Sequence, residues 1–143
     1  MIDTPTVAHL SQVISQVTAP AFLLGAVAAF ISLLITRMNR IVDRSQFLHD
    51  IPDHDHRRAE LKSDLPRLHR RAKLVNRAIL FATIAAIATA LVVILAFVLA
   101  YQEVRHEYGV ALLFIIALCF FTASLVEFAR ECRIALHDFD HRR

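Results

Sequence analysis

Apolar residues gather in three long runs that contain no Asp, Glu, Lys or Arg. The runs cover residues 4–36, 78–102 and 108–126, and they are 33, 25 and 19 residues long. A helix that crosses the hydrocarbon core of a bilayer needs about 20 mostly apolar residues. The pattern therefore predicts three membrane-spanning helices, with crossings at 21–36, 78–101 and 109–127.

The residues before the first crossing follow a different pattern. Four apolar residues recur there at helical spacing, with polar residues between them: Val7, Leu10, Ile14 and Val17. This spacing is typical of a short amphipathic helix on a membrane surface. Thr18 and Pro20 are residues that favour a helix start. We therefore expect an outer amphipathic segment over 1–18 and a separate first helix over 20–48.

Apolar stripes continue beyond the first two crossings. The first stripe holds Leu34, Met38, Ile41, Ser45 and Leu48, and the second holds Leu61, Leu65, Leu68, Ala72 and Val75. Spacings of three and four residues predict helix in both places, the second over 64–101, with Pro66 either opening that helix or kinking it. Residues 49–63, with Pro52 among them, predict a turn, and the last helix is expected over 109–139.

The charged residues indicate how the chain is threaded. Residues 37–77 hold 11 of the 16 Lys and Arg, whereas the loop 102–107 holds one, Arg105. Positive charge near helix ends marks the cytoplasmic side. We expect the N-terminus outside and the C-terminus inside. The fold class is then all-α: one membrane domain over 1–143, an antiparallel three-helix bundle whose helices extend into the cytoplasm as a hairpin.

Composition argues against a soluble enzyme. Of the 143 residues, 57% are hydrophobic and 20% are charged, whereas soluble domains are about 45–50% apolar and about 25% charged. The net charge of +3 lies in the segments beside the crossings, so lipid rather than nucleic acid is the expected partner. Cys119 and Cys132 lie in one predicted helix, about 20 Å apart, which is too far for a disulfide.

Small residues mark faces of the first two helices. Gly25 and Ala29 fall on one face of the first crossing, and Ala82 and Ala86 belong to a ladder of alanines in the second. Small side chains let membrane helices approach closely. These faces serve either packing within one chain or an interface between copies, and we expect a homo-oligomer.

Ionisable residues gather at the inner ends of the crossings. Arg37, Arg40 and Arg44 share one side of the first helix, where they anchor to anionic headgroups, form a basic ring around a pore, or lock to Glu127 or Glu131. Glu127 is the first charge of the third helix and either pairs with Arg130, Arg37 or Arg40 or belongs to an ion pathway.

Histidine and aspartate cluster in the predicted turn and in the C-terminal tail. His54 and His56 lie in the turn, and His137 and His141 lie in the tail. Histidine with carboxylate suits transition metals, but the spacing matches no metal motif on a helix, so a solvated turn is the alternative. The crossings contain no catalytic constellation, and we expect neither enzymatic activity nor a cofactor.

The sequence resembles a known family in three segments. These are "TAPAFLLGAVAAFISLLITRMNRIVDRSQFL" at 18–48, "RLHRRAKLVNRAILF" at 67–81 and "ASLVEFARECRIAL" at 123–136. They are similar to small bacterial three-helix membrane proteins catalogued as domain of unknown function 2721, over about residues 10–137. The resemblance implies a membrane location and the three-helix layout, and we expect the bacterial inner membrane. It implies no activity and no catalytic residues.

Two functions remain open on the sequence. One is a small homo-oligomeric channel, with a pathway between subunits for which Glu127, Ser32 and Thr36 are the candidate lining residues. The other is a non-catalytic scaffold or regulatory subunit that binds a cytoplasmic protein through the hairpin. Polar residues are scarce in the crossings, which is unusual for an aqueous pore, but the symmetry of an oligomer slightly favours the channel.

Overall fold

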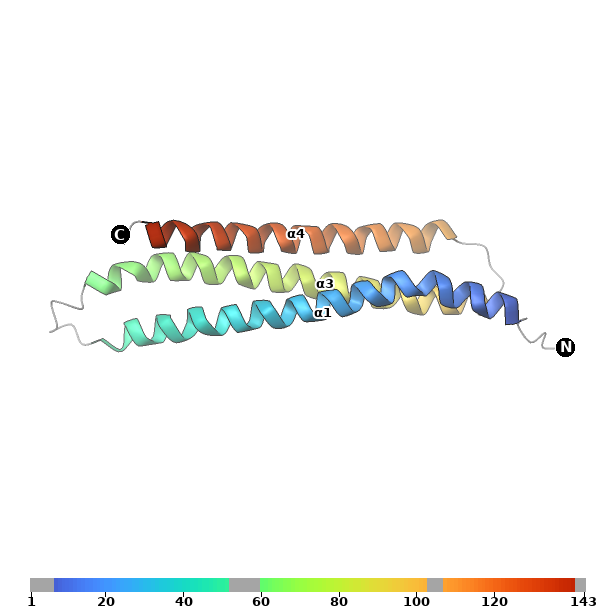
Figure 1. Ribbon diagram of the computed structural model, residues 1–143, viewed down its shortest axis with the longest axis horizontal. Coiled ribbons are helices and arrows are strands. Elements are labelled where there is room, and N and C mark those ends of the chain that lie inside the picture. Colours follow the sequence, from blue (N-terminus) through green and yellow to red (C-terminus); the bar gives the residue numbers. More distant parts are fainter. Residues whose placement is uncertain (1–6, 52–59, 103–106, 141–143) are drawn as a thin grey trace. The chain divides into compact units, whose positions relative to one another are not determined.

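The computed structural model describes residues 7–51, 60–102 and 107–140, and the described residues are helical, without strands (Figure 1). The helices are α1 (Val7–His49), α3 (Leu65–Gln102) and α4 (Glu107–Asp140), and a short 3-10 helix, η1 (Glu60–Asp64), precedes α3. All three α-helices are long and apolar enough to cross a membrane. The predicted all-α class and the three membrane-length helices are therefore confirmed for the described residues.

Each helix is longer than a bilayer requires. At 1.5 Å per residue, the 43 residues of α1, the 38 of α3 and the 34 of α4 correspond to roughly 65, 57 and 51 Å, against a hydrocarbon core of about 30 Å. A single crossing therefore uses only part of each helix.

The N-terminal part of α1 differs from the prediction. Helix α1 runs without interruption from Val7 to His49 and contains Pro20 in its interior, so the predicted separation of segment 1–18 from a helix starting at Pro20 is wrong. Proline removes one backbone donor, which leaves the carbonyl of Gln16 without its helical partner. Apolar surroundings offer the neighbouring backbone groups no alternative to helical bonds, and the helix continues.

Pro66 opens α3. It is the second residue of the helix, a position where the missing N–H has no helical partner to lose. Of the two roles that the sequence allowed, the structure has the helix start. At the other end of this connection, the Asp50 amide donates a hydrogen bond to the Gln46 carbonyl at 3.0 Å and closes α1. Residues 52–59 between them lie outside the described residues.

Buried residues recur every seven positions along each helix. The series are Val13, Pro20, Val27, Leu34, Ile41 and Leu48 in α1; Leu68, Val75, Ala82 and Thr89 in α3; and Ala117, Ser124 and Glu131 in α4. A second series in α3 consists of Ala78, Ala85 and Val92. Seven residues is the period of helices that pack along a common seam.

The chain divides into two compact units, each containing a segment of every helix. Unit 1 comprises Met1–Phe30 and Ala82–Phe121. Its interior is built largely from small residues, and Phe30 meets Phe121 edge to face with ring centroids 5.7 Å apart. The buried hydroxyl of Thr89 donates to the Ala85 carbonyl of its own helix at 2.7 Å. Apart from Glu107, the described part of unit 1 contains no acidic residue, Lys or Arg.

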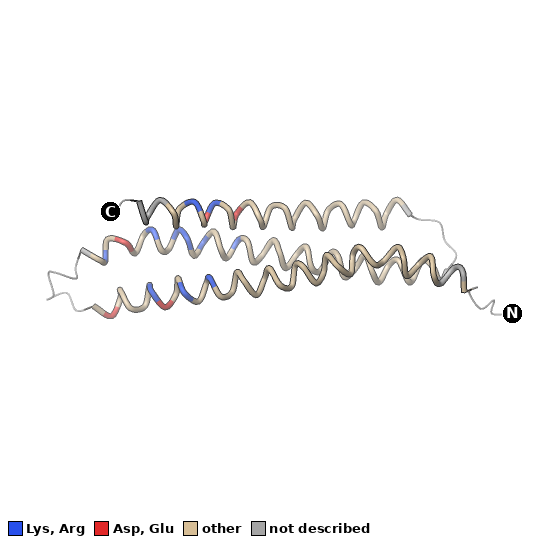
Figure 2. The backbone as a smooth tube through the Cα atoms, in the orientation of Figure 1, with Lys and Arg blue, Asp and Glu red and all other residues tan. Residues whose placement is uncertain are grey.

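Unit 2 comprises Ile31–Phe81 and Thr122–Arg143 and holds nearly all the described charges (Figure 2). Its interior combines large aliphatic side chains, such as Leu34 and Leu48, with two buried glutamates, Glu127 and Glu131. The buried Ser124 hydroxyl donates to the Ala78 carbonyl, which ties α4 to α3. The candidate functional residues with charged side chains that the structure describes therefore lie in unit 2.

Candidate functional site

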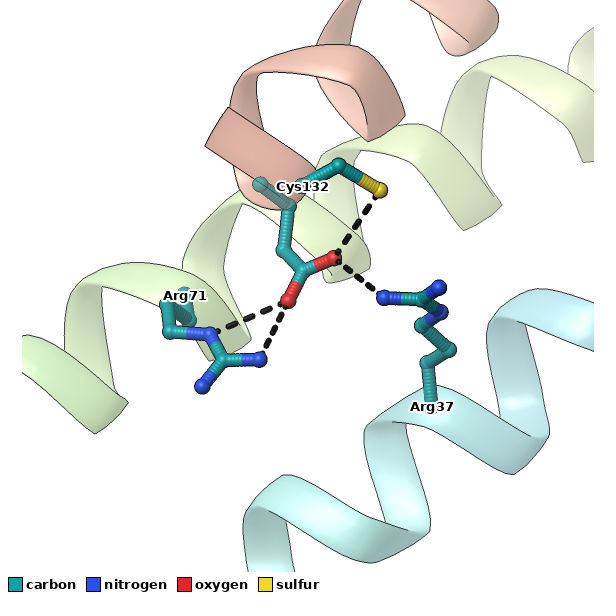
Figure 3. A network of polar contacts seen from close by, with 4 residues as sticks. Arg37, Arg71 and Cys132 are labelled. Carbon is teal, nitrogen blue, oxygen red and sulfur yellow. Dashed lines mark hydrogen bonds and ion pairs between the residues drawn. The ribbon is translucent and has the colours of Figure 1, made fainter. Parts of the chain in front are cut away.

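The Glu131 carboxylate lies between two arginines in the interior of unit 2 (Figure 3). Oε1 accepts hydrogen bonds from Nε and Nη2 of Arg71 at 3.0 and 2.7 Å. Oε2 accepts one from Nη1 of Arg37 at 3.3 Å. Since Arg37 belongs to α1, Arg71 to α3 and Glu131 to α4, this cluster joins all three helices.

The positions of these residues along their helices explain the cluster. Glu131 is itself a member of the seven-residue series of α4, so its side chain points into the unit. Arg37 follows the buried Leu34 by three residues, and Arg71 follows the buried Leu68 by three residues. A residue three positions on lies beside the seam, so both arginines enter from its edge.

Burial makes the pairing necessary. The Glu131 side chain is fully buried, whereas the side chains of Arg37 and Arg71 keep 39% and 21% of their exposure. A buried carboxylate without partners is costly, and hydrogen-bonded arginines are the partners that compensate it best. The two arginines leave the cluster with a net positive charge, and this charge points toward the surface.

Two further groups contact the cluster. The Arg37 guanidinium carbon lies 5.1 Å from the centroid of the Phe128 ring, a cation–π distance. The Cys132 thiol donates a weak hydrogen bond to Oε2 of Glu131 at 3.8 Å. Both contacts bring an uncharged side chain of α4 against the cluster.

Glu127, one helical turn before Glu131, is less well paired. It is 8% exposed, and its Oε1 lies 3.6 Å from Nη1 of Arg130 on the same helix. Its Oε2 is buried and has no hydrogen-bond partner among the described residues. Of the partners that the sequence suggested for Glu127, only Arg130 pairs with it in the described structure.

The three arginines predicted at the inner end of the first crossing, Arg37, Arg40 and Arg44, have different surroundings. Arg37 forms an interhelix pair with Glu131, one of the alternatives open on the sequence. Arg40 and Arg44 are exposed and take no part in the cluster. Arg71 was not among the residues predicted from the sequence, and the available signal was its place one residue before Ala72 in the predicted apolar stripe.

The small residues singled out in the first two crossings differ in burial. Ala82 is fully buried inside unit 1 and Ala86 is half-buried there, so the alanine ladder serves packing within the chain. Gly25 and Ala29 are exposed, and a Cβ added to Gly25 would meet no atom within 4 Å.

The candidate pore-lining hydroxyls are exposed. Ser32 and Thr36 both lie on the outside of α1 in unit 2, and the Thr36 hydroxyl donates to the Ser32 carbonyl at 2.9 Å. Bonding to its own helix lets Thr36 face an apolar surrounding without losing a hydrogen bond.

The proposed metal residues fall mostly outside the described structure. His54, His56 and His141 lie outside it, and His137 lies in α4 at a position whose side chain is not described. Among the described residues, no group of three or more His, Cys, Asp and Glu is arranged to hold a metal ion.

Comparison with known proteins finds one family. The sequence model of the family described as "Protein of unknown function (DUF2721)" matches residues 17–141. Comparison with curated proteins finds no match. Comparison with solved structures finds none.

Proposed function

Because the chain belongs to the DUF2721 family and has three membrane-length helices, we propose that it is a bacterial inner-membrane protein with three crossings. We propose further that it is a non-catalytic scaffold or regulatory subunit. In this proposal the apolar helix segments lie in lipid, and the charged helix ends form a rigid platform for a cytoplasmic protein.

The contacts inside unit 2 support an antiparallel arrangement of α3 and α4. Ser124 bonds to Ala78, and seven residues further along α4, Glu131 bonds to Arg71, seven residues earlier in α3. Contacts that advance along one helix and retreat along the other are those of antiparallel neighbours. Short connections between consecutive membrane helices favour the same arrangement.

The charges support an orientation with unit 2 at the cytoplasmic side. Eleven of the 16 Lys and Arg lie in 37–77, which includes the predicted turn at 49–63. Basic residues beside crossings favour the cytoplasmic side. The N-terminus and the loop between α3 and α4 are then outside, and the C-terminus is inside.

The observation that carries the scaffold proposal is the fully buried Glu131 between Arg37 and Arg71. The cluster uses one residue of every helix to hold the charged half of the helices together. A pore-lining carboxylate would have to face an axis between copies, whereas both glutamates face the interior of unit 2. This geometry suits a rigid platform better than a conducting ring.

The channel is the second candidate. It is favoured by the exposure of Gly25, Ala29, Ser32 and Thr36 on α1, which would let copies approach closely and present hydroxyls to a pathway between them. In such an assembly the lining would consist of Ser32 and Thr36, without the third candidate lining residue, Glu127, which is buried in unit 2.

Flux and crosslinking experiments separate the two candidates. For the scaffold, proteoliposomes should show no ion flux beyond empty vesicles across a range of voltage, tension and pH. A photo-crosslinker at the exposed Gln46 of unit 2 should give a discrete adduct with another protein, and one at the exposed Gln12 of unit 1 should not. Ion flux together with adducts between copies alone would overturn the scaffold in favour of the channel.

A further inference from the structure

The exposed surface of unit 2 is strongly basic. Among the described residues, the exposed bases are Arg40, Arg44, Arg67, Arg70, Lys73, Arg77, Arg130 and Arg133, whereas the exposed acids are Asp43 and Asp50. The excess is larger because the two acids of α4 in this region, Glu127 and Glu131, are buried. Burial removes their negative charge from the surface and leaves the arginines facing outward.

Helix α3 contributes the densest part of this surface. Arg70, Lys73 and Arg77 share one exposed face at spacings of three and four residues, and α3 contains no acidic residue along its entire length. Within the described parts of the chain, none of these three has an ion-pair partner. Arg71 differs from them, because it turns inward to Glu131.

The basic face continues directly into an exposed apolar one. Leu80 follows Arg77 by three residues on the same face of α3 and is 56% exposed. On α4, the exposed Val126 precedes the exposed Arg130 by four residues. A surface that changes from apolar to basic within one helical turn matches the boundary between hydrocarbon and headgroups.

We infer that the face formed by Arg70, Lys73 and Arg77 binds the headgroups of anionic phospholipids. Long basic side chains at this depth keep their stems along apolar surface and their charges among phosphates. An arginine binds a phosphate through two parallel hydrogen bonds, and each basic residue near an anionic surface favours binding by roughly fivefold. This inference holds for a scaffold and for a channel, because it concerns the lipid-facing side of one helix.

Lipid is favoured over an acidic protein by the continuity of the two faces. A protein bound to Arg77 would also have to cover Leu80 and the apolar residues beyond it, which the bilayer itself covers. An anionic lipid satisfies both parts at once, with its phosphate at the arginines and its chains along the apolar face.

Native mass spectrometry of the full chain in uncharged detergent tests this inference. Phosphatidylglycerol and phosphatidylcholine are offered in equal amounts, and the ratio of bound lipids is measured. The wild type should prefer phosphatidylglycerol by up to about 125-fold, about fivefold for each of the three bases, and Arg70→Gln with Arg77→Gln should reduce that preference by up to about 25-fold. The matched control, Arg142→Gln with Arg143→Gln, removes the same charge at the end of the chain and should change it little.

Three arms complete the test. Arg70→Lys with Arg77→Lys retains the charge and should retain the preference, which gives a result even if the Gln variant fails to fold. Raising the salt concentration should lower the preference, and millimolar inorganic phosphate should not displace the lipid. An equal preference in the wild type and in a folded Gln variant, or displacement by inorganic phosphate, would overturn the inference. An unchanged lipid preference would indicate that the basic face binds an acidic protein instead. Displacement by inorganic phosphate would indicate a site for free phosphate.

Discussion

Glu131 and Glu127 lie one turn apart on the same helix, yet their surroundings are opposite. Glu131 accepts three hydrogen bonds from two arginines of other helices, whereas Glu127 has one long contact with the mostly exposed Arg130 and a buried oxygen without a partner among the described residues. Breaking a buried pair is strongly destabilising, but an exposed pair contributes little. The two residues should therefore respond differently to the same substitution.

Replacing Glu131 should destabilise the protein strongly. Glu131→Gln removes the charge that both arginines face, and we expect a loss of about 3 kcal/mol, the lower end of the range for a broken buried pair, because Arg37 is partly exposed. Thermal unfolding in a mild detergent, followed by circular dichroism, measures the change. Arg40→Gln is the control, because Arg40 is exposed and takes no part in the cluster, and its expected loss is below about 1 kcal/mol. Equal losses in both variants would show that the cluster does not hold the helices together.

The same substitution at Glu127 should have little effect or a stabilising one. Glu127→Gln replaces a buried carboxylate that lacks a partner for Oε2 with a neutral amide, which costs less to bury. We expect a change of less than about 1 kcal/mol, since the lost contact with Arg130 is long and the Arg130 side chain is mostly exposed. A loss as large as that of Glu131→Gln, in the same unfolding measurement, would mean that Glu127 has partners that the described structure lacks.

At the scale of the helix, apolar spacing predicted the buried stripes well. Leu34, Ile41 and Leu48 in α1 and Leu68 and Val75 in α3 belong to the predicted apolar stripes and are buried, whereas the other five members of those stripes are half-buried. The pairing of Glu131 with Arg37 and Arg71 could not be predicted in the same way. Glu127 and Glu131 share a face of one helix, and only the register of α4 against the other helices decides which of them meets the arginines. That register depends on packing between segments far apart in sequence.

Pro20 shows a different reason for a failed prediction. Its position after Thr18 has the local signals of a helix start, but the helix passes through it. The Thr18 hydroxyl donates to the Ile14 carbonyl at 2.8 Å instead of capping a new helix. Local capping preferences were measured in water, where an interrupted backbone can bond to solvent. A helix in apolar surroundings lacks that alternative.

Enlarging small residues should separate packing within the chain from association between chains. Ala85 is fully buried in unit 1, so Ala85→Leu should overpack the interior and cost about 1–3 kcal/mol. Gly25→Leu meets open space and should leave thermal stability nearly unchanged. If copies associate through α1, Gly25→Leu should reduce the assembled mass measured by native mass spectrometry. A destabilised Gly25→Leu monomer would contradict the exposure of this face.

At the scale of the whole molecule, the uneven distribution of charge is the main feature. Apart from Glu107, the described residues of unit 1 carry no acid, Lys or Arg, and unit 2 carries the remaining described charges (Figure 2). The sequence predicts this division because charge-free runs are visible without any knowledge of packing. The same division favours the proposed orientation, with unit 2 at the cytoplasmic side.

The accessibility of single cysteines tests the orientation of unit 2 toward the cytoplasm. Single cysteines at Ser11, Ser63 and Gln102, in a background without Cys119 and Cys132, are treated with a membrane-impermeant maleimide in intact spheroplasts. Cysteines at positions 11 and 102 should react, and the cysteine at position 63 should react only after permeabilisation. Reaction at position 63 in intact spheroplasts, with protection at position 102, would invert the orientation. Reaction at only one of positions 11 and 102 would contradict the three crossings.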